Sequence, residues 1–156
     1  MFSFFERNVE KRILSDHLQK FGLGLADLSP AVLKRILDVL HRQVIAVARK
    51  YHEPVYNVSE NIVSSATWGI VYCLLGPTKL LQIHPGFKDM AEEIEMELLI
   101  SERGFASENN IYQQVFAILF DTAHCHPEVS DLLSRMRLTA ANLDQQAGDR
   151  RYVSMH

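Results

Sequence analysis

Two pairs of possible metal ligands share one spacing in this chain. Asp38 and His41 are three residues apart, and so are Asp121 and His124. Because residues three apart lie on the same face of an α-helix, the carboxylate and imidazole of each pair could bind one ion together. Helical bundles that hold two iron or manganese ions use such pairs, usually Glu-x-x-His, with further glutamates from other helices. The resulting chemistry would be oxygen activation or metal-assisted hydrolysis.

Glu60 and either Glu93 or Glu97 could complete such a site. The expected orientation of the first pair argues against it, because Asp38 falls about 140° and His41 about 80° from the centre of the apolar stripe of their helix. The second pair also falls on the polar side of its helix. We therefore expect all four side chains to be solvated and no cofactor to be bound, and keep a metal-dependent bundle enzyme as the alternative function.

The adjacent residues His124, Cys125 and His126 form a second cluster, directly before Pro127. Neighbouring residues of a helix point about 100° apart, so their ligand atoms do not converge on one ion. Cys125 is the one plausible nucleophile, because a neighbouring imidazolium would lower the pKa of its thiol. Cys73 lies in an apolar segment and is expected to be an inert core residue.

Aromatic residues near the two ends of the chain suggest a docking surface. Phe2, Phe4, Phe5 and Tyr152 could contact a partner protein or a second copy of the chain. Their alternative role is to cap the core of the domain itself. No glycine-rich nucleotide-binding motif, Gly-x-Ser-x-Gly or His-Glu-x-x-His motif occurs in the sequence. We therefore expect a protein that binds rather than one that catalyses.

The elements that position these residues are predicted to be helices. The clearest spans residues 30–51, where Ser29 is a candidate N-cap and Pro30 suits the first helical position. Its apolar residues recur every three or four positions. They are Leu33, Ile36, Leu37, Leu40, Val44 and Val47. Further helices are predicted at residues 3–21, 57–75, 85–103, 107–124 and 127–143.

The segment at residues 66–75 is apolar on every side, which is typical of a central, buried helix. Its β-branched and aromatic residues would also suit a strand, but the flanking helices favour a helix. Trp68 and Tyr72 within it define a third possible function, a small-molecule sensor with a pocket in the core of the bundle. We expect Asn57 and Glu60 to form a capping pair at the start of this helix.

Length and composition bound the fold and its setting. The 156 residues, 47% hydrophobic and 22% charged, suit one all-α domain of five to seven helices at residues 1–144, followed by a polar tail at 145–156. The longest uncharged stretch has an apolar centre of ten residues, too short for the roughly 20 of a transmembrane helix. The N-terminus lacks the pattern of a secretory signal. We therefore expect a cytoplasmic protein with reduced thiols.

Charge is unevenly distributed along the chain. The total is −3, which argues against a nucleic-acid partner. Residues 1–50 hold nine basic and five acidic side chains, whereas residues 51–110 hold three basic and nine acidic ones. Such asymmetry can drive self-association. The sequence thus predicts a protein-binding module, an adaptor, regulator or inhibitor of another protein, that forms homo-oligomers.

Overall fold

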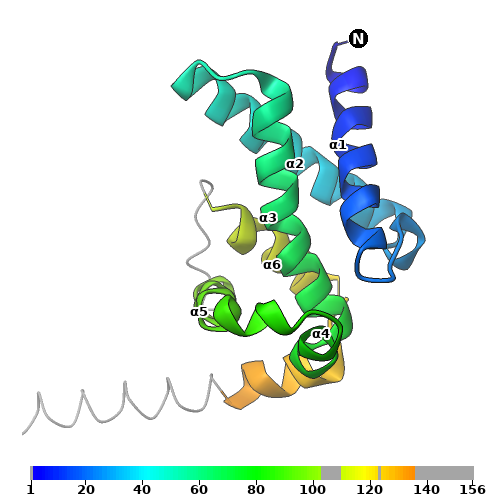
Figure 1. Ribbon diagram of the computed structural model, residues 1–156, viewed down its shortest axis with the longest axis vertical. Coiled ribbons are helices and arrows are strands. Elements are labelled where there is room, and N and C mark those ends of the chain that lie inside the picture. The colour runs from blue at the N-terminus through cyan, green and yellow to red at the C-terminus, as the bar shows by residue number, and fades with distance from the viewer. Residues whose placement is uncertain (1, 103–109, 123, 136–156) are drawn as a thin grey trace, which may run out of the picture.

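The computed structural model describes residues 2–102, 110–122 and 124–135, with side chains from residue 8 to 100 and in the two later ranges. Every regular element among them is helical, so the predicted all-α fold is confirmed (Figure 1). The elements are α1 (Phe2–Gln19), α2 (Pro30–Tyr51), α3 (Val55–Leu75), α4 (Pro77–Ile83), α5 (Ala91–Glu102), α6 (Ile111–Asp121) and a helix at residues 127–135, with 3-10 turns at Leu25–Asp27 and Pro85–Asp89.

Helix α3 occupies the centre of the bundle, as its apolar sequence predicts. It packs against α1, α2, α4 and α6, and most of its side chains from Val63 to Leu75 are buried. A Cβ atom at Gly69 would lie only 3.4 Å from the ring of Phe116, so the missing side chain lets α6 approach α3 closely. The segment at residues 66–75 is thus helix and not strand, since it lies within α3 and packs on several helices around it.

The ends of two helices follow from local capping. Helix α2 has the predicted bounds, and the Ser29 hydroxyl accepts a hydrogen bond from the Val32 N–H at 3.3 Å. Helix α3, in contrast, begins at Val55 directly after Pro54, with no side-chain cap. The expected capping pair of Asn57 and Glu60 is wrong, because both residues already lie inside the helix.

The chain from residue 77 to residue 102 differs from the single helix predicted at 85–103. Helix α4 comes first, a 3-10 turn follows, and α5 begins only at Ala91. The N–H of Phe87 donates to the His84 carbonyl, and the N–H of Met90 donates to the Phe87 carbonyl, both at 2.9 Å. These tight turns place Phe87, only 2% exposed, against the ring of Tyr72 in α3. Burial of one aromatic side chain thus overrides the local helical pattern.

Helix α6 begins at Ile111, where the Asn110 Oδ1 accepts a hydrogen bond from the Gln113 N–H at 3.1 Å. The predicted start of this helix at residue 107 lies outside the described residues, as does the predicted continuation of the last helix beyond residue 135. Within the described part of the chain, no helix has the length and apolar character needed to cross a membrane.

The end of α2 and the start of α3 extend away from the rest of the bundle as a helical hairpin (Figure 1). We call residues 44–62 the arm. The arm has a small core of its own, built on Val44, Ala48 and Val58. His52, with a φ of +52°, ends α2 in the left-handed conformation and allows the chain to reverse before Pro54.

Candidate functional site

The outer surface of α2 near the arm is basic. Arg42, Arg49 and Lys50 are exposed there, and Tyr51, at the end of the helix, is 59% exposed. The Lys50 Nζ lies 5.4 Å from the centre of the Tyr51 ring, a cation–π contact that positions both groups. Arg42 and Arg49 share one side of α2, and Lys50 and Tyr51 continue around the end of the helix. We call these four residues the basic face. A large exposed aromatic ring among cations is typical of protein-binding surfaces.

The start of α5 carries the opposite charge. Glu92, Glu93 and Met96 are spaced as on one face of α5, and Asp89 lies in the 3-10 turn before it; all four are exposed, with Met96 at 58%. We call these four residues the acidic face. The two glutamates in the first turn also stabilise α5 itself, through its helix dipole. The exposed methionine has no such local explanation, and it adds an adaptable apolar centre to this surface.

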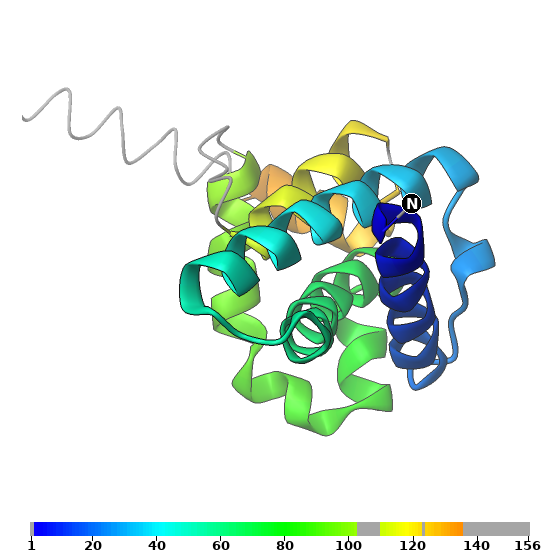
Figure 2. The ribbon, with the colours of Figure 1, turned by 90° about the horizontal axis from the view of Figure 1, so that it is seen from above.

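The tip of the arm and α5, which carry residues of the basic and acidic faces, both lie toward the left in Figure 1 and Figure 2, and they are separated along the vertical axis of Figure 1. Two separate surfaces of opposite charge allow a second copy, rotated by 180°, to satisfy both at once.

Two other carboxylates of α5 are partly buried. The Glu97 carboxylate accepts hydrogen bonds from the Gln113 Nε2 at 2.6 Å and the Asn110 Nδ2 at 3.0 Å, which join α5 to the start of α6. Burial raises the pKa of Glu95, and the nearby charge of Glu92 raises it further. The acidic residues of this helix are thus divided between two partly buried carboxylates and the exposed acidic face.

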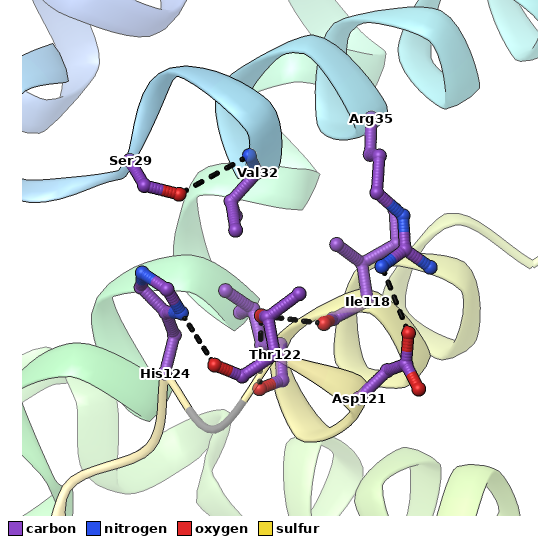
Figure 3. Close-up of polar contacts among 8 residues, drawn as sticks. Ser29, Val32, Arg35, Ile118, Asp121, Thr122 and His124 are labelled. Carbon is purple, nitrogen blue, oxygen red and sulfur yellow. Dashed lines mark hydrogen bonds and ion pairs between the residues drawn. The ribbon is translucent and has the colours of Figure 1, made fainter.

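The four predicted metal ligands are not brought together. His41 Nδ1 contacts the Glu10 carboxylate at 3.1 Å, and Asp121 forms an ion pair with the Arg35 guanidinium at 2.9 Å. His124 Nδ1 donates to the Thr122 carbonyl at 2.9 Å (Figure 3). Across the described residues, no three His, Cys, Asp or Glu side chains are grouped so that they could hold a metal ion.

The expectation that Asp38 and His41 are solvated is wrong. Both are part-buried, because α1 packs against the side of α2 that the apolar stripe leaves uncovered. The partner of His41 is Glu10, which is 0% exposed. Sequence reasoning missed Glu10, although its helical spacing from the buried residues Leu14 and Leu18 shows that it faces the core.

The predicted docking aromatics are not tested by the structure. Phe2, Phe4 and Phe5 belong to α1, but their side chains, like the whole of Tyr152, lie outside the described residues. The arm tyrosines Tyr51 and Tyr56, 59% and 58% exposed, were not singled out from the sequence. The sequence feature that could have identified them is the turn between two predicted helices, because side chains near such a turn have few neighbours.

Trp68 and Tyr72, the residues of the predicted sensor pocket, lie within an aromatic cluster. The Trp68 ring contacts Phe21 and His84, with ring centres 5.2 and 5.0 Å away, and Tyr72 contacts Phe87. Tyr72 is 0% exposed, and burial raises the pKa of its hydroxyl. These aromatic rings thus pack on one another.

A surface hollow of about 560 Å³ lies away from this aromatic cluster, on the arm itself. Its lining residues are Glu53, Pro54, Tyr56, Asn57, Glu60 and Asn61.

The two cysteines are unexpectedly close. Cys73 in α3 is buried and Cys125 after α6 is partly exposed, and their thiols are hydrogen-bonded to each other. Burial raises the pKa of Cys73, whereas the hydrogen bond from Cys73 lowers the pKa of Cys125. Sequence reasoning treated the two residues separately, because nothing in their spacing of 52 residues indicates contact.

Comparison with known proteins found no matching family model, no matching curated protein and no matching solved structure.

Proposed function

We propose that this chain is a cytoplasmic protein-binding module that associates with a second copy of itself, and that the pair acts as an adaptor, regulator or inhibitor of another protein. The observation that carries the proposal is the presence of two separate exposed surfaces of opposite charge, the basic face on α2 and the acidic face at the start of α5. Each includes a large exposed apolar or aromatic side chain, Tyr51 or Met96. Charge complementarity around an apolar centre is the common arrangement of specific interfaces.

In the proposed pair, the basic face of each copy lies on the acidic face of the other. The two contacts are equivalent, so the pair is closed and leaves no unsatisfied face to extend a filament. Arg49 and Lys50 would meet Glu92 and Glu93, while Tyr51 would pack near Met96. Exposed ion pairs contribute only about 0.2–1 kcal/mol each, so the aromatic and thioether contacts must supply much of the affinity.

Charge-reversal variants test this arrangement by sedimentation velocity. The arm variant is Arg49→Glu/Lys50→Glu, and the α5 variant is Glu92→Lys/Glu93→Lys. Each alone places like charges in both contacts and should be monomeric at concentrations where the native chain is a dimer. Mixing the two variants pairs an acidic arm with a basic α5, and a native arm with a native α5. The mixture should therefore dimerise as the native chain does.

A matched control reverses two exposed cations of α1, in the variant Lys11→Glu/Arg12→Glu. It changes the net charge as much as the arm variant does, but it should dimerise normally. Circular dichroism checks that every variant stays helical. A native chain that is monomeric at all concentrations, or single variants that still dimerise, would overturn the proposal.

A further inference from the structure

We propose that Cys73 and Cys125 are a redox pair, which a hydroperoxide oxidises to an intramolecular disulfide and a thiol reductant restores. This inference is independent of the self-association proposed above. It assigns a modification site where the sequence predicted one inert thiol and one weak candidate nucleophile. Reversible disulfides of this kind are the form that redox sensing takes in reducing compartments.

The contact between the two thiols is held by the backbone on both sides. The His126 N–H donates to the Cys73 carbonyl at 2.7 Å, which fixes the residue after Cys125 on the end of α3. The Thr78 N–H, at the start of α4, donates to the Glu128 carboxylate at 2.7 Å. The segment that carries Cys125 is thus attached at two points to the part of the chain that carries Cys73. Fixed segments keep the sulfur atoms together, as a disulfide requires.

The imidazole of His126 strengthens this attachment. A Cβ atom at Gly76 would lie 2.9 Å from the His126 Nδ1, so the ring packs directly on the glycine backbone at the end of α3. The same Nδ1 accepts a hydrogen bond from the Glu128 N–H at 3.1 Å. Gly76, with a φ of +81°, is the residue at which the chain leaves α3, and it is the residue on which the His126 ring packs.

The environments of the two thiols assign their roles. Cys125 is partly exposed, and its pKa is lowered by the hydrogen bond from Cys73, so it is the thiol that peroxide reaches as a thiolate. Cys73 is fully buried, and burial raises its pKa, so it stays protonated until Cys125 has reacted. Cys125 is therefore the attacking residue and Cys73 the resolving residue.

The reaction has two steps with hydrogen peroxide as the oxidant. The Cys125 thiolate attacks one peroxide oxygen; an S–O bond forms, the O–O bond breaks, and the leaving hydroxide takes up a proton to become water. The Cys73 sulfur then attacks the sulfur of the sulfenic acid; the S–S bond forms, the S–O bond breaks, and hydroxide leaves as water with the Cys73 proton. Two thiols lose two electrons and two protons, and one peroxide becomes two waters.

The test treats the reduced full-length chain with hydrogen peroxide and follows its intact mass and its free thiols. We expect both thiols to disappear together, the mass to fall by about 2 Da for the two hydrogens lost, and dithiothreitol to reverse both changes. A proteolytic digest should yield one peptide pair linked through Cys73 and Cys125.

Two variants separate the roles of the thiols. In Cys73→Ala, Cys125 should stop at the sulfenic acid, with a mass gain of about 16 Da that dimedone traps. In Cys125→Ser, Cys73 should remain a thiol under the same treatment. Intermolecular disulfides, stepwise oxidation of Cys125 without a link in the native chain, or thiols that react only after unfolding would each overturn the proposal.

Discussion

The imidazole of His41 in α2 contacts the carboxylate of Glu10 in α1 at 3.1 Å, and Glu10 has no exposed surface. A carboxylate in the core is tolerated only when hydrogen bonds replace its lost hydration. This pair therefore ties the position of α1 on α2 to one specific contact. It also explains why α2 carries polar residues on a side that α1 covers and not solvent.

Removing His41 should destabilise the protein strongly. We expect His41→Ala to lower the free energy of unfolding by about 3 kcal/mol, because Glu10 loses a partner while it stays buried. Urea denaturation measures this change. The matched control is His17→Ala, which removes a similar contact of 2.9 Å to Glu60, whose side chain is 47% exposed. Water can replace that contact, so the cost should be below about 1 kcal/mol. Equal costs would contradict the role assigned to burial.

Gly76 should not tolerate a side chain. Gly76→Ala places a Cβ at a φ of +81° and 2.9 Å from the His126 ring, so both the backbone and the ring must shift. We expect a loss of about 2–3 kcal/mol in thermal or urea unfolding. Gly22→Ala is the control, because Gly22 has a φ of +75° with nothing within 4 Å of the added atom. It should cost only about 1 kcal/mol, the price of the left-handed backbone alone.

Glu95 should lower stability at neutral pH. Burial and the charge of Glu92 raise its pKa in the folded chain, so the folded state binds this proton more tightly than the unfolded state does. Stability therefore falls as pH rises through the carboxyl range, and the loss is complete above the folded pKa. We expect Glu95→Gln to raise the melting temperature at pH 7 and to have no effect below about pH 3, where both states are protonated. If Glu95→Gln also raised the melting temperature in acid, the gain would come from better packing and not from removal of the charge.

Self-association should weaken with salt. Screening shortens the reach of exposed charges from about 10 Å at 0.1 M to about 3 Å at 1 M ionic strength. We therefore expect the dimer dissociation constant to rise roughly tenfold between 0.05 and 0.5 M NaCl, measured by sedimentation equilibrium. Association that salt leaves unchanged or strengthens would indicate an apolar contact and remove the argument from charge.

The oxidised chain should unfold at higher urea than the reduced chain. A disulfide between Cys73 and Cys125 closes a loop of 52 residues and restricts the unfolded chain. The expected gain is roughly 2–4 kcal/mol. Peroxide treatment of Cys125→Ser provides the control and should give no gain. A destabilised disulfide form would show that the fold resists the bond.

Local interactions along the sequence were sufficient to predict the helical fold, the bounds of α2 and the central place of α3. The spacing of Leu33, Ile36 and Leu40 and the Ser29 cap act within a few residues, so they can be read without the rest of the chain. The break before α5 could not be predicted in this way, because it depends on the burial of Phe87 against α3.

The candidate sites were decided by tertiary structure. Helical periodicity states which side a residue faces, but not what packs there, so Asp38 and His41 were assigned to solvent although α1 covers them. The contact between Cys73 and Cys125 and the contact between His41 and Glu10 each join segments far apart in the chain. Such contacts depend on how whole helices pack. The packing of two helices is determined by many side chains along both of them, and the two residues in contact do not determine it alone.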